Sequence, residues 1–143
     1  MPTVLFGTWN TASNQVRLNW VKPAGGLYNP AGFTNTVLAN IATLSGGLTG
    51  THTVGITNGA FALSYDMTFA GLGQKATKVN GPTNSIVVSQ DPYGKLTVKF
   101  GNGNAKATTT GYAGVLEDAQ TGAGFFIPTF PTGATDSGTI TVQ

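Results

Sequence analysis

The alternation of apolar and polar residues is the strongest pattern in this chain, and it predicts β-strands. It is clearest at 60–69, where every second residue is large and apolar: Phe61, Leu63, Tyr65, Met67 and Phe69. Successive side chains of a strand point to opposite faces, so this aromatic side is expected to face the core. Similar patterns predict strands at 36–44, where a helix is the weaker option, and at 51–57, 124–127 and 137–143.

A turn motif predicts the register of a hairpin over 85–101. Asp91-Pro92-Tyr93-Gly94 has preferred residues at the first, second and fourth positions of a type I turn, and Gly94 is expected to adopt a positive φ. Counting outwards pairs Asp91 with Lys95, Ser89 with Thr97, Val87 with Lys99, Val88 with Val98 and Ile86 with Phe100. One face of the hairpin is then apolar, and the other carries Ser85, Val87, Ser89, Lys95, Thr97 and Lys99.

The chain begins with a second predicted hairpin. Its strands, at 3–9 and 15–21, flank a run of turn-forming residues at 10–14. Alternation gives the second strand two faces: Val16, Leu18 and Trp20, which are expected to face the core, and Arg17 and Asn19.

These elements together predict a mainly β protein, with an antiparallel sheet and an N-terminal hairpin, in one structural domain over 1–143. A short helix near 110–120 is left open: Tyr112, Val115, Leu116 and Ala119 fall near helical spacing, but the glycines between them disfavour a helix. An immunoglobulin-like β-sandwich is the alternative arrangement of the strands.

The composition indicates a protein that associates with itself. Only 8% of the 143 residues are charged, whereas an ordinary soluble domain has about 25%. Other copies of the chain would cover such a surface, so we expect a homo-dimer and higher assembly. The absence of cysteine excludes disulfides and thiolate metal sites. No apolar run is long enough for a transmembrane helix, so no membrane partner is expected.

The sequence shows no catalytic constellation, so we expect no enzymatic activity and no cofactor. His52 is the one histidine, and its Thr-rich strand favours a structural role. Glu117-Asp118 is the one close pair of acids, and neighbouring side chains diverge on a strand or a helix. The spacing of His52 and the acids indicates no metal site.

Lysines gather in the second half of the chain and indicate a surface for nucleic acid. Lys95 and Lys99 lie on the polar face of the predicted hairpin with Ser89 and Thr97, and Lys75 and Lys78 precede it. A sheet face with lysines, hydroxyls and few acids can lie against phosphates, so single-stranded RNA is an expected partner. An ordinary solvated face that uses lysine for solubility stays open as the alternative.

The order of elements resembles the coat proteins of single-stranded RNA bacteriophages. The resemblance rests on Thr3-Val4-Leu5-Phe6-Gly7, on Val16-Arg17-Leu18-Asn19 and on the Pro- and Gly-rich segment 23–30. It implies a capsid subunit that is made in the host cytoplasm and forms the virion, with dimers that close a shell and a sheet face that binds RNA. That family ends in two helices, whereas this chain ends in strand-like sequence.

The segment 131–142 resembles the last strand of chaperone–usher pilins, which implies the alternative of a cell-surface fimbrial subunit. In that family a neighbour's N-terminal strand completes the fold, and 3–9 would be the donor. Such subunits carry a secretion signal, which the first residues of this sequence do not lead us to expect. For either assembly, the strands expected to join subunits contain Val4, Phe6, Val16, Leu18, Ile140 and Val142.

A sugar-binding β-domain is a third class that the residues leave open. Such a protein would use exposed aromatic side chains beside amides or carboxylates. Tyr28 and Tyr93 are the candidates, because alternation places Trp20 with the core residues.

Overall fold

The computed structural model describes residues 4–25, 30–40, 44, 46–58, 61–101, 108–116, 118–127 and 137–143. By its contacts, the chain divides into two compact units, Met1–Thr43 and Leu44–Gln143. A division by contacts does not decide whether the two units fold together, so the single structural domain expected over 1–143 stays a prediction. The fold class is confirmed: the described residues form antiparallel β-sheets and no helix.

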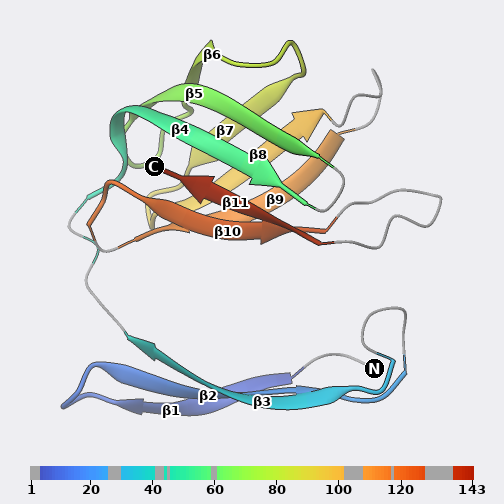
Figure 1. Ribbon diagram of the computed structural model, residues 1–143. Coiled ribbons are helices and arrows are strands. Elements are labelled where there is room, and N and C mark those ends of the chain that lie inside the picture. The colour runs from blue at the N-terminus through green and yellow to red at the C-terminus, as the bar shows by residue number, and fades with distance from the viewer. Residues whose placement is uncertain are drawn as a thin grey trace. The chain divides into compact units, whose positions relative to one another are not determined.

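The first unit is a three-stranded antiparallel sheet in the order β1-β2-β3 (Figure 1). Its strands are β1 (Val4–Asn10), β2 (Gln15–Lys22) and β3 (Phe33–Asn40). The predicted N-terminal hairpin is confirmed, and the side chain of Asn10 closes its turn by accepting a hydrogen bond from the Ala12 backbone N–H at 3.0 Å. The helix option at 36–44 is wrong for the described residues there, because β3 pairs with β2 along its whole length.

The second unit is an eight-stranded antiparallel sheet that curls around a core (Figure 1). Its strands are β4 (Thr49–Thr57), β5 (Ala62–Ala70), β6 (Thr77–Asn80), β7 (Ile86–Gln90), β8 (Lys95–Gly101), β9 (Thr108–Val115), β10 (Gly122–Phe126) and β11 (Gly138–Val142). Their order in the sheet is β6-β5-β4-β11-β10-β9-β8-β7. Apart from the pairing of β11 with β4, neighbours in the sheet are neighbours in sequence, unlike the Greek-key order of an immunoglobulin-like sandwich.

A short segment before β6 links the two ends of this sheet. The Ala76 N–H donates to the carbonyl of Val88, and the Gln90 N–H donates to the carbonyl of Gln74, each at 2.9 Å. Between them Lys75 forms a bridge with Ser89. The sheet is therefore nearly closed into a ring, which leaves few unpaired backbone groups at its edges.

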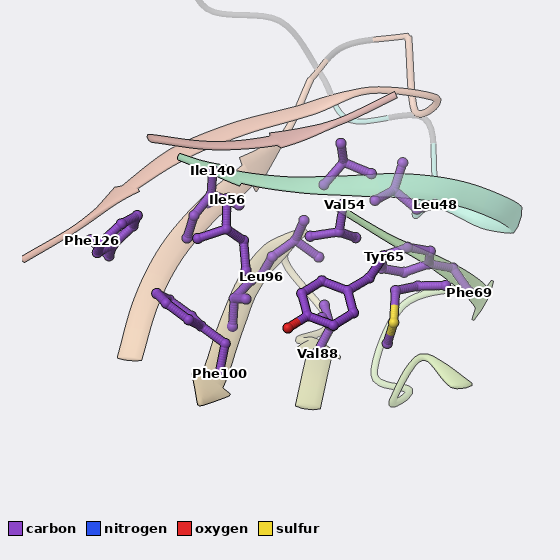
Figure 2. Packing of buried hydrophobic residues seen from close by; sticks show 14 residues of the cluster. Leu48, Val54, Ile56, Tyr65, Phe69, Val88, Leu96, Phe100, Phe126 and Ile140 are labelled. Atoms are coloured by element: carbon purple, nitrogen blue, oxygen red, sulfur yellow. The ribbon is translucent and has the colours of Figure 1, made fainter. Parts of the chain in front are cut away.

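The core lies inside the curled sheet and contains the alternate residues of its strands (Figure 2). Tyr65, Met67 and Phe69 of β5 are at most 3% exposed, which confirms that the aromatic side of this strand faces the core. Opposite them Phe100 and Phe126 meet edge to face, with ring centroids 5.0 Å apart. Burial of these large side chains is the main stabilisation of this unit.

The β7–β8 hairpin has the register that its turn predicts. Ser89 pairs with Thr97 and Val88 with Val98, and Gly94 adopts a φ of 83°. The Asp91 carboxylate accepts hydrogen bonds from the backbone N–H groups of Tyr93 and Lys95, both at 2.8 Å. Each partner in this turn is thus within four residues of Asp91, which is why local sequence predicts it.

The short helix that the sequence allows near 110–120 is wrong for the residues described there. Residues 108–115 form β9, whose inward positions are small: Thr109, Gly111 and Ala113. A Cβ on Gly111 would lie 2.4 Å from Cδ1 of Ile140 and 2.8 Å from Cβ of Phe126, so the large side chains of other strands fill this space. The short strand β6, which the alternation does not predict, pairs with β5 at one end of the sheet.

Candidate functional site

Four of the residues predicted to face RNA lie together on the outer surface of the curled sheet. Ser89 and Thr97 are direct partners across β7 and β8, and Lys95 and Lys99 lie two positions either side of Thr97. The residues that alternate with them, Val88, Leu96, Val98 and Phe100, are fully buried. Since these buried side chains occupy the inward face, and successive side chains alternate between faces, the lysines and hydroxyls must point outward.

Lys75 joins this group through the segment that links the sheet ends. It pairs with Ser89, so both side chains stand on the same outer face. Lys75 is exposed, and the pairing brings it close to Lys95 and Lys99, from which it is distant in sequence. The sequence pattern alone gave no reason to place it beside Ser89.

Two exposed aromatic residues extend the same row of partners. Thr97 pairs with Tyr112 of β9, and Tyr112 pairs with Phe125 of β10. Tyr112 is 50% exposed and Phe125 is 57% exposed. We call Lys75, Ser89, Thr97, Tyr112 and Phe125, together with Lys95 and Lys99 on either side of Thr97, the outer row.

Neither aromatic residue stands out in the sequence as a functional candidate. Tyr112 also falls near helical spacing, and the helix left open there competes with the alternation that places it on the outer face of the sheet. Phe125 precedes Phe126, and only the pairing shows which of the two faces outward: Phe126 is 1% exposed. The signal that could have found Tyr112 is the alternation of 108–113 with small residues at every second position.

Lys95 and Lys99 flank Tyr112. Both are diagonal neighbours of Tyr112, because Thr97 between them is its direct partner. Diagonal neighbours on one face have Cβ atoms about 7–8 Å apart, within reach of a lysine side chain. The outer row therefore places the rings of Tyr112 and Phe125 beside the hydroxyls of Ser89 and Thr97, with lysine ammonium groups within reach of Tyr112.

Positive charge dominates this face. The strands β7–β10 contain Lys95 and Lys99 but no acidic residue. Among the described residues, the carboxylate that pairs with this face is Asp91: its Oδ2 lies 3.9 Å from Nζ of Lys95, whose side chain is 60% exposed. Such an exposed pair contributes little to stability, and Lys95 can turn to an anion at small cost.

Lys78 is not brought to this group. Its Nζ donates a hydrogen bond to the carbonyl of Pro82 and lies 5.3 Å from the centre of the Tyr65 ring. The ammonium group of Lys78 is therefore bound near β6, by the Pro82 carbonyl and the Tyr65 ring.

The predicted assembly residues separate into three places. Val16 and Leu18 lie on one face of the three-stranded sheet, and Phe6 lies on the other. Ile140 and Val142 are fully buried in the core of the eight-stranded sheet, where they stabilise the subunit itself. Val4 begins β1 and pairs with Val21.

The contacts of His52 and Asp118 indicate structural roles for both residues. The ring Nε2 of His52 is 2.9 Å from the carbonyl of Thr49, and the ring packs against Phe69 at 5.8 Å. Among the described residues no group of three histidines, cysteines or acids could hold a metal. Hydrogen bonds from the Gln120 and Thr121 backbone and the Thr121 hydroxyl lower the pKa of Asp118, which closes a turn. Glu117 lies outside the described residues.

The two sugar-binding candidates are placed differently. Tyr93 is 89% exposed at the tip of the β7–β8 turn. Tyr28 lies outside the described residues. The sugar-binding class stays a prediction.

Comparison of the chain with protein-family models, with curated proteins and with solved structures gave no match. The resemblances to phage coat proteins and to pilins therefore stay hypotheses, and function has to be argued from the residues themselves. In the described part of the chain there is no long apolar helix of the kind that crosses a membrane.

Proposed function

We propose that this chain is the structural subunit of a self-assembling, coat-like particle and that the outer row contacts single-stranded RNA. The observation that carries the proposal is the exposed Tyr112–Phe125 pair with Lys95 and Lys99 on the diagonals of Tyr112. The proposal assigns the protein to a virion and gives it no catalytic role.

The chemistry of the outer row matches the three parts of a single-stranded nucleic acid. Lysine ammonium groups neutralise phosphates, and the contact carries no sequence information. Unpaired bases stack on aromatic faces, which contributes about 1–3 kcal/mol per base. The hydroxyls of Ser89 and Thr97, between the lysines and the rings, can donate to phosphate or sugar oxygens.

A merely solvated sheet face would explain the lysines but not the aromatic pair. Aromatic partners across strands do stabilise a sheet, by about 0.2–1 kcal/mol. That structural role predicts a loss of stability when Phe125 is replaced and no loss of RNA affinity. The two interpretations therefore differ in a quantity that can be measured.

Strand donation has less support from the pairing of the strands. In the described residues β11 has neighbours on both sides, β10 and β4, so no donor strand is needed beside it. The expected donor, β1, is already paired with β2 on one side. The fimbrial alternative stays a prediction from the resemblance alone.

The test replaces Lys95 and Lys99 together by Gln, with Lys78→Gln as the matched control. Each lost phosphate contact should reduce the slope of log K against log salt by about 0.7 for a single-stranded oligonucleotide, so the double variant should lose about 1.4. The control should keep the wild-type slope, because Nζ of Lys78 is engaged by Pro82. Purified particles of the double variant should also hold less RNA by their ratio of absorbance at nucleic-acid and protein wavelengths.

Two results would count against the proposal. Equal salt slopes for wild type and the double variant would remove these lysines from the RNA contact. Unchanged affinity in Phe125→Leu, together with reduced thermal stability, would assign the aromatic pair to the sheet rather than to bases.

A further inference from the structure

The three-stranded sheet of residues 4–40 is a single layer with two unlike faces. Direct partners share a face, so the register places Leu5, Trp9, Val16, Leu18, Trp20 and Val37 on one side. We call this side the apolar face. It is largely open: Leu5 is 59% exposed, Trp9 60%, Trp20 43% and Val37 38%. Trp20 was expected in a core and is not, because the described residues of this unit form one layer only.

The opposite face is mixed: it carries the exposed apolar side chains of Phe6 and Leu38 together with polar side chains that bond with one another. The side-chain amide of Gln15 donates to Asn40 at 3.1 Å, and the Thr36 hydroxyl donates to Asn19 at 3.0 Å. Arg17 also lies on this side, since it pairs with Thr8. An antiparallel sheet whose two faces differ in polarity normally packs its more apolar face against another layer.

The open area is large enough for a stable interface. An aromatic side chain can bury 150–250 Å², so one that is half exposed presents roughly 100 Å². The apolar face as a whole then presents roughly 500 Å², near the largest patch found on most monomers. Two such faces in contact would bury about 1,000 Å² before any rim is added, close to the lower limit of specific interfaces.

We infer that a second copy of this chain covers the apolar face with the same face of its own three-stranded sheet. This inference rests on the proposed self-assembly and names the surface that performs it. Two sheets pack face to face about 10 Å apart with interdigitating side chains, and an apolar patch is self-complementary about a two-fold axis. Interfaces between identical subunits are also the more apolar kind.

The charges on the face favour a copy of the chain over a lipid surface or an acidic partner. Lys22 is the cation on this side, at one end of β2, and its Nζ donates to the carbonyl of Gly25 at 3.1 Å. Proteins that lie on membranes usually surround an apolar patch with several basic residues. Here Arg17 points to the opposite face, so no such ring forms.

Two neighbouring residues of β1 provide a matched test. Leu5 and Phe6 are 59% and 54% exposed and lie on opposite faces of the same strand. Leu5→Lys should weaken self-association at least about 100-fold, because a charge would be buried without a partner. Phe6→Lys should associate like the wild type. Sedimentation equilibrium of nuclease-treated protein at high salt measures this without bridging by RNA.

Val37→Lys on β3 repeats the test at a second site of the apolar face, and circular dichroism shows that each variant is folded. A wild type that stays monomeric at micromolar concentration would overturn the inference, as would equal weakening by Leu5→Lys and Phe6→Lys. Binding of the wild type to phosphatidylserine vesicles with loss of the dimer would also overturn it. Loss of RNA binding with an intact dimer would contradict only the proposed RNA contact.

Discussion

Replacing Gly94 is expected to destabilise the eight-stranded sheet, because two independent features of this position exclude a side chain. Its φ is 83°, a region that L-residues other than Asn and Asp rarely adopt. A Cβ at this position would lie 2.5 Å from Cδ2 of Leu44. The carbonyl of Gly94 also accepts the Val115 N–H at 2.9 Å, so a shift of the turn would strain β9 as well.

The size of the effect follows from these two contributions. A left-handed conformation costs an L-residue about 1–2 kcal/mol. Moving the Leu44 side chain off its rotamer costs about 0.5–1.5 kcal/mol more. Gly94→Ala should therefore lose about 2–3 kcal/mol, and Gly94→Val more, since a β-branched side chain is stiffer. For a unit of this size, about 4–8 °C of Tm is lost per kcal/mol.

Thermal and urea unfolding followed by circular dichroism measure this loss. Gly114→Ala is the control, because Gly114 pairs with Lys95 beside the same turn and a Cβ there meets nothing within 4 Å. Gly94→Asn should cost less than Gly94→Val, because asparagine tolerates positive φ. If Gly94→Val and Gly114→Ala unfolded at the same temperature, the assigned turn geometry would be incorrect.

Three further predictions concern single side chains. Gln90→Leu should cost about 1–3 kcal/mol in urea unfolding, because the buried N–H of Leu48 would lose its 2.9 Å acceptor; an unchanged midpoint would contradict this. Tyr65→Phe should leave Tm equal or higher, because the buried hydroxyl makes no hydrogen bond to any described residue and burial raises its pKa; a clear drop in Tm would reveal a partner. Asp118→Ala should lower Tm at neutral pH. The difference in Tm from wild type should vanish as the pH falls through the lowered pKa of Asp118 in the folded protein. A difference in Tm that persists in acid would exclude the charged carboxylate as its cause.

The outer row shows how much of the candidate site the sequence could predict. Lys95, Thr97, Lys99 and Ser89 follow from one turn and one alternation, both of which depend on contiguous residues. Tyr112 and Phe125 belong to other strands, and the turn and alternation of 85–101 do not predict how those strands pair. Their place in the row depends on the pairing of β8 with β9 and of β9 with β10.

The amino-acid sequence by itself determined the strands with strong alternation, the N-terminal hairpin and the register of β7 with β8. Those features arise from the pleat of a strand and the conformations that Asp, Pro and Gly allow, which are local properties. The tertiary structure alone decided which apolar faces are closed. Tyr65 and Trp20 both lie on apolar faces, yet Tyr65 is fully buried and Trp20 is 43% exposed. The difference arises because the eight-stranded sheet curls around its own apolar side, whereas three strands in one layer cannot.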